Sequence, residues 1–272
     1  MRCERVSKAT SCERVNRLQS LVFALVVFAF TAHATRLAYR PQTGICGAAV
    51  AGDVDTVRSL LALNPAAIHE TDRSASALHW AADYGQTAVV ECLLTNGAPV
   101  NATNQWGGTA LQRAASRGSE QVVRLLLAHH ADPSILDQDG ETALGMACSY
   151  GRNLSVVTML LDHQADPNRG NPTPLQEAAF RGEDRIIELL VQRGANINAR
   201  GFDGAGALHW AVDGRHENTV KLLLARGASP VMADDQGKTS QQWATERRAA
   251  EKWWKRGKLR RIDRLLRENT SK

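Results

Sequence analysis

The sequence lacks the short motifs that usually indicate catalysis. Its 272 residues contain no glycine-rich phosphate loop, no Gly-x-Ser-x-Gly elbow and no His-Glu-x-x-His zinc site. Aspartate and glutamate are scattered over positions expected to face solvent, so no pair of carboxylates stands out as an acid and a base. We therefore predict that the chain is not an enzyme, has no catalytic residues and requires no cofactor.

Cysteine is scarce, and its spacing excludes a metal site. Of the five cysteines, Cys3 and Cys12 precede the repetitive part of the chain, and Cys46, Cys92 and Cys148 lie far apart within it. No histidine stands at metal-ligand spacing from a cysteine or a carboxylate. The three cysteines within the repeats occupy positions where the other repeats carry small or apolar residues. We therefore expect these thiols to be free and buried, and we expect no bound metal.

Long apolar runs are missing, with one short exception. Residues 21–30 read LVFALVVFAF, which is shorter than the roughly 20 residues that cross a bilayer. Basic residues precede this run and Ala32-His33-Ala34 follows it, as in a secretory signal. We predict a signal peptide or signal anchor over residues 1–34 and a linker over 35–43. If this signal is used, we expect the chain to enter the secretory pathway or to associate with a membrane. If it is not used, we expect a cytoplasmic chain, which the unpaired cysteines favour.

What is abundant is repetition. One apolar position recurs at intervals of 33, 33, 33, 31 and 33 residues, at Ile45, Leu78, Leu111, Leu144, Leu175 and Leu208. A capping residue precedes it, a first helix rich in alanine follows, and a second helix rich in valine and leucine comes next. Two helices and a turn cannot bury their own apolar face, so neighbouring units must stack.

This pattern resembles the ankyrin repeat family. The resemblance is carried by the TPLQEAA phrase at 173–179, the glycine after the first helix, the Val-Val-x-x-Leu-Leu core and the Gly-Ala-x-x-Asn turn. It implies an all-α solenoid of helix-turn-helix units joined by projecting β-turn fingers. About six repeats would occupy 44–236, and a degenerate C-terminal cap with a basic tail would occupy 237–272. It also implies a monomeric, non-catalytic adaptor or scaffold that binds a partner protein.

In this family, ligands usually lie along the concave side and contact the finger tips and the ends of the first helices. Twenty positions of the chain are equivalent to these, and five of them are aromatic, although the overall aromatic content of 5% predicts one. The residues that the resemblance assigns to partner binding are Tyr84, Trp106, Arg117, Asp139, Tyr150, Arg169, Phe180, Arg181, Phe202 and Asp203.

The aromatic positions do not all have the same interpretation. Trp106 and Phe202 lie on finger tips, where no core is available to cover them, so we expect them to contact a partner. Three others, Tyr84, Tyr150 and Phe180, either contact a partner or pack over a helix end. Trp80 and Trp210 lie within first helices, where packing between repeats is expected.

The irregular interval of 31 residues marks one joint of the stack. The unit that contains Leu144 has one extra residue after Gly151, and the loop before Thr173 is three residues short. We predict an altered finger around Arg169 that influences partner choice. In the unit over 205–235, Gly214-Arg215 replaces the usual terminal glycine, and we expect the helix junction there to shift by one residue.

The end of the chain is strongly basic. Residues 246–272 contain eleven Lys or Arg and four Asp or Glu, a net charge of +7, and the whole chain carries +5, which leaves −2 for the remainder. Apolar residues at helical spacing indicate a terminal cap with one cationic face. The alternative is an electrostatic binder of nucleic acid or anionic membrane. It would act through Arg247, Arg248, Lys255, Arg256, Lys258, Arg260 and Arg261.

Overall fold

The computed structural model describes residues 43–201, 203–250 and 257–270. The predicted signal segment at 1–34 therefore lies outside the described residues. The same holds for most of the predicted linker, for Phe202 on its finger tip, and for Lys255 and Arg256 in the basic tail. No helix of the described ranges is long and apolar enough to cross a membrane.

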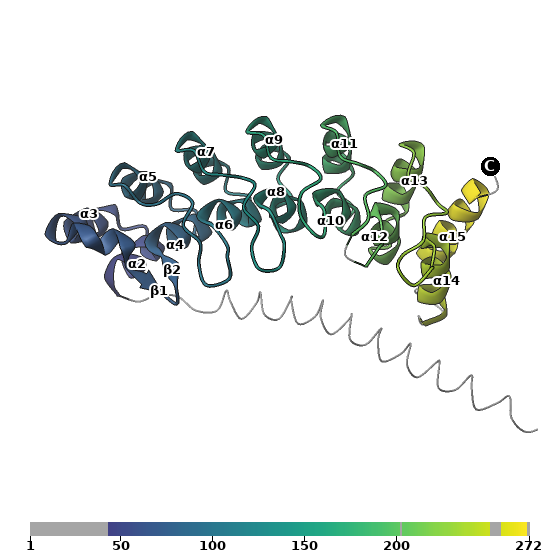
Figure 1. The fold of residues 1–272 in the computed structure, drawn as a ribbon, viewed down its shortest axis with the longest axis horizontal. Coiled ribbons are helices and arrows are strands. Elements are labelled where there is room, and N and C mark those ends of the chain that lie inside the picture. The colour runs from purple at the N-terminus through teal and green to yellow at the C-terminus, as the bar shows by residue number, and fades with distance from the viewer. Residues whose placement is uncertain (1–42, 202, 251–256, 271–272) are drawn as a thin grey trace, which may run out of the picture. The chain divides into compact units, whose positions relative to one another are not determined.

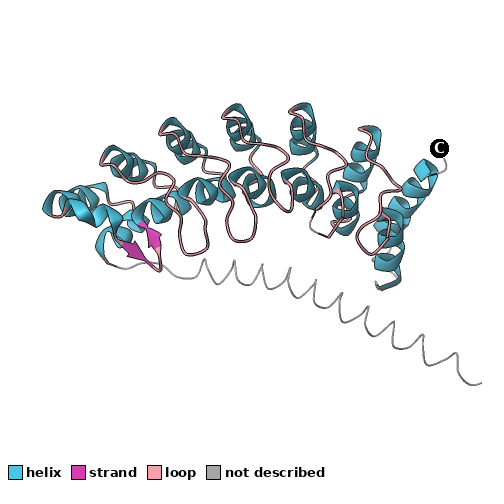
Figure 2. Ribbon diagram, in the orientation of Figure 1, coloured by secondary structure: helices cyan, strands magenta, loops and turns pink. Residues whose placement is uncertain are grey.

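The described chain alternates short helices with projecting loops (Figures 1 and 2). The helices of the inner row are α2 (Gly44–Ala51), α4 (Ala77–Asp83), α6 (Ala110–Arg117), α8 (Ala143–Met146) with the π-helical turn η2 (Ala147–Gly151), α10 (Pro174–Arg181), α12 (Ala207–Asp213) and α14 (Ser240–Ala250). The outer row consists of α3 (Val54–Leu63), α5 (Thr87–Thr95), α7 (Glu120–Ala128), α9 (Leu154–Asp162), α11 (Asp184–Gln192) and α13 (Glu217–Ala225). The described chain also contains a 3-10 turn η1 (Pro65–His69), a hairpin of β1 (Thr71–Asp72) and β2 (Ala75–Ser76), and helix α15 (Gly257–Thr270).

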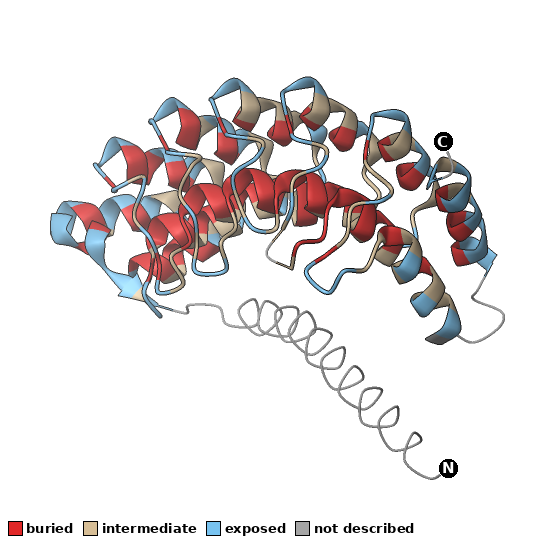
Figure 3. Ribbon diagram, turned by 45° about the vertical axis from the view of Figure 1, so that its right-hand side comes forward, coloured by how far each residue is buried: buried red, intermediate tan, exposed pale blue. Residues whose placement is uncertain are grey.

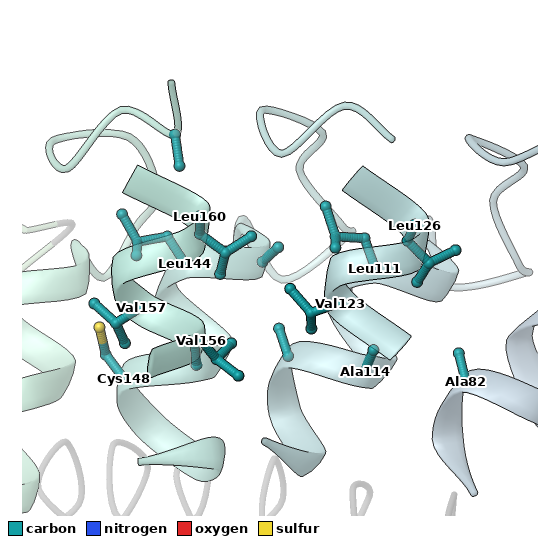
Figure 4. Packing of buried hydrophobic residues seen from close by; sticks show 14 of the residues in the cluster. Ala82, Leu111, Ala114, Val123, Leu126, Leu144, Cys148, Val156, Val157 and Leu160 are labelled. Carbon is teal, nitrogen blue, oxygen red and sulfur yellow. The ribbon is translucent and has the colours of Figure 1, made fainter. Parts of the chain in front are cut away.

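The first helices of three consecutive units begin where a threonine hydroxyl accepts a backbone N–H bond. The Thr109, Thr142 and Thr173 hydroxyls cap α6, α8 and α10 in this way, as expected of N-cap residues. The alanines that follow are buried, so neighbouring inner helices approach closely (Figure 3). In Figure 4 the recurring leucines, such as Leu111 and Leu144, point toward the valines and leucines of the outer helix of the same unit. The predicted all-α class is confirmed.

A side-chain tie joins most units to the next finger. It comes from the residue after the recurring leucine, which is His79, Gln112, Gln176 or His209. Gln112 Nε2 donates to the carbonyls of Ile135 (3.1 Å) and Glu141 (2.8 Å) in the following finger. His79 Nε2 bonds the Gly108 carbonyl at 3.0 Å, and His209 Nε2 the Lys238 carbonyl at 3.1 Å. The polar residues at this position therefore join the repeats.

A second tie links the loops that follow the outer helices. The Asn101 Oδ1 accepts the Asp132 N–H at 2.8 Å, and Asn168 and Asn198 do the same for the next loops. Asn168 also donates to the Gly194 carbonyl at 3.1 Å. Each asparagine therefore accepts a hydrogen bond from a backbone N–H group of the next loop, which would otherwise need another partner.

The joint after the Leu144 unit lacks both ties, because Gly145 and Ser134 occupy the two positions. Instead, Arg169 Nε donates to the Ser134 carbonyl at 2.8 Å, and the Asn171 N–H to the Gly140 carbonyl at 3.0 Å. The extra residue of this unit is accommodated by the π-helical turn η2, a known way to insert one residue into a helix.

Two helix ends depart from the glycine pattern of the other units, and the second corrects an expectation. The left-handed residue that ends the first helix of the Leu144 unit is Arg152 (φ 44°) rather than Gly151. The helix junction after α12 is not shifted, because Arg215 adopts the left-handed conformation (φ 60°) that glycine adopts elsewhere. Glycine is needed at position 214 for a different reason: a Cβ there would lie 2.3 Å from the Phe180 carbonyl oxygen.

The last two helices close one end of the stack. Helix α14 packs on α12, and α15 packs on α13 and α14. Leu259, Ile262 and Leu266 of α15 are fully buried. The apolar face predicted from the spacing of these residues therefore covers the terminal repeat.

Candidate functional site

The finger face is the surface formed by the finger tips and the exposed side of the inner helices. It corresponds to the concave surface of the ankyrin resemblance. The predicted binding residues that the structure describes lie on its fingers or at the ends of its inner helices, in consecutive units. Three groups of contacts organise these residues along the stack.

The first group lies between α4 and α6. The Arg117 guanidinium donates twice to the Asp83 carboxylate, through Nε and Nη2, both at 3.1 Å. This bidentate pair raises the pKa of Arg117 and fixes a guanidinium next to Tyr84, whose side chain is exposed. A cation and an aromatic ring are thereby presented at adjacent helix ends.

The second group surrounds Trp106 on its finger. The Trp106 backbone is held on both sides, because its N–H donates to Asn104 Oδ1 at 2.9 Å and its carbonyl accepts the Gln138 N–H at 2.9 Å. The Arg113 guanidinium carbon lies 6.0 Å from the indole centroid, within cation–π range. Trp106 is partly exposed, which agrees with its predicted place on a tip.

The third group is centred on Arg181 at the end of α10. Its guanidinium carbon lies 5.5 Å from the Tyr150 ring centroid and 5.4 Å from that of Phe180. Its Nη2 also donates to the Ser149 hydroxyl at 3.3 Å. Phe180 in turn meets Trp210 edge to face, with centroids 5.8 Å apart. Phe180 thus packs against its neighbours and remains partly exposed.

Sequence reasoning missed two carboxylates beside Arg181. Burial raises the pKa of Glu141 to about 8, and the negative charges of Glu177, Asp137 and Asp139 add to this effect. Burial also raises the pKa of Glu177, although a hydrogen bond from Ser149 and the charge of Arg181 oppose the change. The two glutamates are 36 residues apart in sequence, and only the stacking of their units brings them together.

Two further predicted residues, Asp203 and Arg169, form hydrogen bonds within the fingers, and a third, Asp139, lies on a finger tip. Asp203 Oδ1 accepts the Ala205 N–H at 3.0 Å, and its carbonyl accepts the Asp235 N–H, so it shapes a turn. Arg169 makes the bond to the Ser134 carbonyl described above and remains exposed. Asp139 is exposed at the tip of its finger.

Three arginines of the basic tail are engaged in ion pairs within the chain. Arg247 pairs with Asp213 at 2.5 Å, Arg248 with the buried Asp263 at 2.9 Å, and Arg261 with Glu217 at 2.7 Å. Lys258 and Arg260 are exposed and form no ion pair with a residue that the structure describes. The tail therefore presents less free positive charge than its composition indicates.

The prediction of free, buried cysteines is confirmed for the three in the repeats, and the histidine that joins two units is also buried. Burial lowers the pKa of His79 to about 4, and its ring accepts the Ser76 N–H at 3.2 Å while bonding the next finger. Cys46, Cys92 and Cys148 are free and buried, and burial raises the pKa of Cys46 to about 11. Within the described ranges, no three side chains of the metal-binding types come together.

Comparison with known proteins agrees with this architecture. A model of ankyrin repeats in three copies matches residues 45–137 and 126–201, and a single ankyrin repeat model matches residues 203–235. The chain belongs to the ankyrin repeat family, whose repeats generally mediate protein–protein interaction.

The relatives share only their repeats with this chain. It is 38% identical over 73 residues to BCL-6 corepressor-like protein 1 of Homo sapiens, and 38% identical over 93 residues to SH3 and multiple ankyrin repeat domains protein 2 of Homo sapiens. It is also 38% identical over 101 residues to the mitochondrial disaggregase of Bos taurus. These matches cover 27%, 32% and 35% of the chain, but only 4%, 5% and 15% of the relatives.

Solved structures show the same fold. The human ASB11 ankyrin repeat domain superposes with a TM-score of 0.70 at 23% identity, covering 84% of this chain and 97% of that domain. The ankyrin repeat domain of Bcl-3, a member of the IkappaB protein family, gives a TM-score of 0.65 at 27% identity and covers 84% of this chain and 100% of that domain. The ankyrin solenoid predicted from the repeats is confirmed.

Proposed function

We propose that the chain is a non-catalytic scaffold that binds a partner protein along the finger face. The observation that carries this proposal is the row of partly exposed aromatic rings held in place by arginines. Trp106 lies beside Arg113, and Tyr150 and Phe180 flank Arg181. Aromatic residues and arginine dominate the energetics of protein interfaces, and side chains fixed before binding lose little entropy on association.

The test is quantitative capture of partners by the full chain and by a variant that combines Trp106→Ala with Tyr150→Ala. Each aromatic anchor removed from an interface typically costs 2 kcal/mol or more, roughly a thirtyfold loss of affinity. We expect the variant to lose partners that the wild-type chain captures, while its circular dichroism spectrum is unchanged.

Leu63→Ala is the matched control, because Leu63 is 85% exposed at the end of α3 in the outer row. It removes apolar surface away from the finger face and should leave capture intact. Equal capture by the wild-type chain and the double variant would show that the finger face is not the binding surface.

A second candidate is an electrostatic binder of nucleic acid or anionic membrane through the tail. The observation that favours it is the exposure of Arg260 and Arg264, which are four residues apart and hence on one side of α15. Such binding should weaken steeply with added salt. Exchanging Lys258, Arg260 and Arg264 for glutamine should abolish this binding. Binding that is unaffected by added salt and by these substitutions would show that the tail is not the binding site.

A further inference from the structure

We propose that the finger of Trp106 holds a carboxylate group of the partner, between the side-chain amide of Asn104 and the guanidinium of Arg113. The inference rests on the proposed function, since it names a chemical group of the partner at that same finger face. It is carried by a buried amide donor that has no acceptor, at a place where another repeat of the chain supplies one.

The Asn104 side chain is buried at the base of this finger, with 6% of its surface exposed. Its Oδ1 accepts two backbone N–H groups, from Trp106 at 2.9 Å and from Gly108 at 3.1 Å. These two donors fix the orientation of the amide, so the remaining atom is Nδ2. No described residue accepts a hydrogen bond from Nδ2. A buried donor without an acceptor is costly, and such groups are rare in folded proteins.

The last repeat shows where Nδ2 points. Asp234 is equivalent to Asn104, because each donates its N–H to the carbonyl four residues later at 2.9 Å, and each Oδ1 accepts two backbone N–H groups of its own loop. The Asp234 Oδ2, which corresponds to Asn104 Nδ2, accepts the Trp243 Nε1–H at 2.8 Å. Trp243 follows Asp234 by nine residues, as Arg113 follows Asn104. The Asn104 Nδ2 therefore faces the position of the Arg113 side chain.

The Leu208 repeat shows the same arrangement without its carboxylate. Gly201 stands there at the position of Asp234, and Trp210 stands at the position of Trp243. The buried Nε1–H of Trp210 has no acceptor among the described residues. An aspartate at this loop position therefore serves the side chain nine residues later, and its loss leaves a donor without an acceptor.

The Trp106 finger brings two donors to this place. The Asn104 Nδ2 donates only, and so does the Arg113 guanidinium, whose carbon lies 6.0 Å from the Trp106 ring centroid. A carboxylate has two acceptor oxygens and one negative charge, so it matches one amide and one guanidinium, whereas a phosphate dianion would keep an unbalanced charge. Arg113 and Trp106 are partly exposed, so a group from solvent enters by displacing their side chains.

The experiment uses the full chain labelled with ¹⁵N. The probes are Nα-acetyl-glutamate N-methylamide, which carries a side-chain carboxylate, and Nα-acetyl-leucine, which carries a terminal one. Their matched controls are Nα-acetyl-glutamine N-methylamide and Nα-acetyl-leucine N-methylamide, which lack the charge. We expect the Asn104 side-chain amide resonances to shift with the carboxylates only, and the larger shift identifies the source of the group. The amide resonances of Asn218, which is exposed on α13 in the outer row, should not move.

The variant Asn104→Asp assigns these resonances and also supplies the missing acceptor within the chain, as Asp234 does in the last repeat. We expect its urea midpoint to rise and its affinity for the carboxylate probes to fall roughly tenfold or more, the effect of losing a hydrogen bond to a charged group. Gln105→Glu is the matched control, because it adds the same charge on an exposed side chain of the same finger. It should keep the Asn104 shift.

Unmoved Asn104 resonances would mean that only water meets Nδ2, and they would overturn the inference. Equal shifts with the uncharged compounds, or undiminished binding by Asn104→Asp, would overturn it as well. Capture of partners separates it from the proposed function. Partners that Asn104→Asp retains and the Trp106 and Tyr150 variant loses would refute the carboxylate site alone. Carboxylate shifts, together with no loss of partners in the Trp106 and Tyr150 variant, would refute the proposed function alone.

Discussion

Replacing Gln176 with alanine should destabilise the stack more than any change at an exposed position. The Gln176 Oε1 accepts the Thr173 N–H at 2.9 Å, and its Nε2 donates to the carbonyls of Ala199 (3.2 Å) and Ala205 (2.9 Å). Gln176 is fully buried. A net contribution of about 1 kcal/mol for each bond gives a loss of about 3 kcal/mol in the free energy of unfolding, measured by urea denaturation.

The chain contains its own controls for this number. Gln242 occupies the equivalent position in the last inner helix, where it accepts the Thr239 N–H at 2.7 Å but has no following finger to bond. Gln242→Ala should therefore cost about 1 kcal/mol, the share of the cap alone. Gln176→His should cost about as little, because His79 performs both tasks in its own unit through its two ring nitrogens.

Two results would refute this reasoning. One is a Gln176→Ala variant as stable as Gln242→Ala, which would mean that the bonds to the next finger contribute nothing. The other is a Gln176→His variant as unstable as Gln176→Ala, which would mean that shape rather than hydrogen bonding matters at this position.

Three further outcomes are expected. Gly151→Ala should lower the free energy of unfolding in urea by about 1–3 kcal/mol, because a Cβ there would lie 2.3 Å from the Ala115 carbonyl oxygen, and wild-type stability would contradict that contact. Because the pKa of His79 is lowered in the folded chain, the unfolded chain binds the proton first, and the contribution of His79 to the free energy of unfolding is complete above pH 6.5 and is lost as pH falls toward 4. His79→Gln should not show this loss, which is on the order of 3 kcal/mol in acid urea titrations. Parallel pH curves for the two chains would refute it. If residues 1–34 are a cleaved signal, Edman sequencing of the chain secreted by a eukaryotic host should begin at Thr35, whereas an intact Met1 would exclude cleavage.

The sequence predicts the regular part of this fold well because each feature is local. A serine or threonine before most of the first helices, a histidine or glutamine three positions later, and buried alanines recur in register. His79 and Thr173 therefore do in the structure what their positions predict. Arg215 shows the limit, since an arginine adopts the left-handed conformation there and the glycine beside it lies against the Phe180 carbonyl, and neither follows from the local sequence.

The candidate site is less predictable because it depends on pairs of units. The aromatic positions follow from the repeat, but the contacts of Arg181 with both neighbouring rings require the stacked structure. The Glu141 and Glu177 cluster had no local signal, although an acidic residue at the two facing positions of adjacent units could have indicated it. The composition of the tail overestimates its free positive charge, because three of its arginines form ion pairs with carboxylates that are distant in sequence. These carboxylates belong to Asp213, Asp263 and Glu217.

The missing ties at Gly145 and Ser134 have a mechanical consequence. A solenoid under tension behaves as a series of springs, and the element with the fewest cross-links extends first. The joint between the Leu144 and Leu175 units lacks the two buried ties, and its side-chain bonds come from Arg169, Arg181 and the Arg152–Glu183 ion pair, which are exposed or partly exposed. A partner bound to the fingers on both sides of this joint would add cross-links over it. Pulling experiments should then show the first yield force rising when the partner is present.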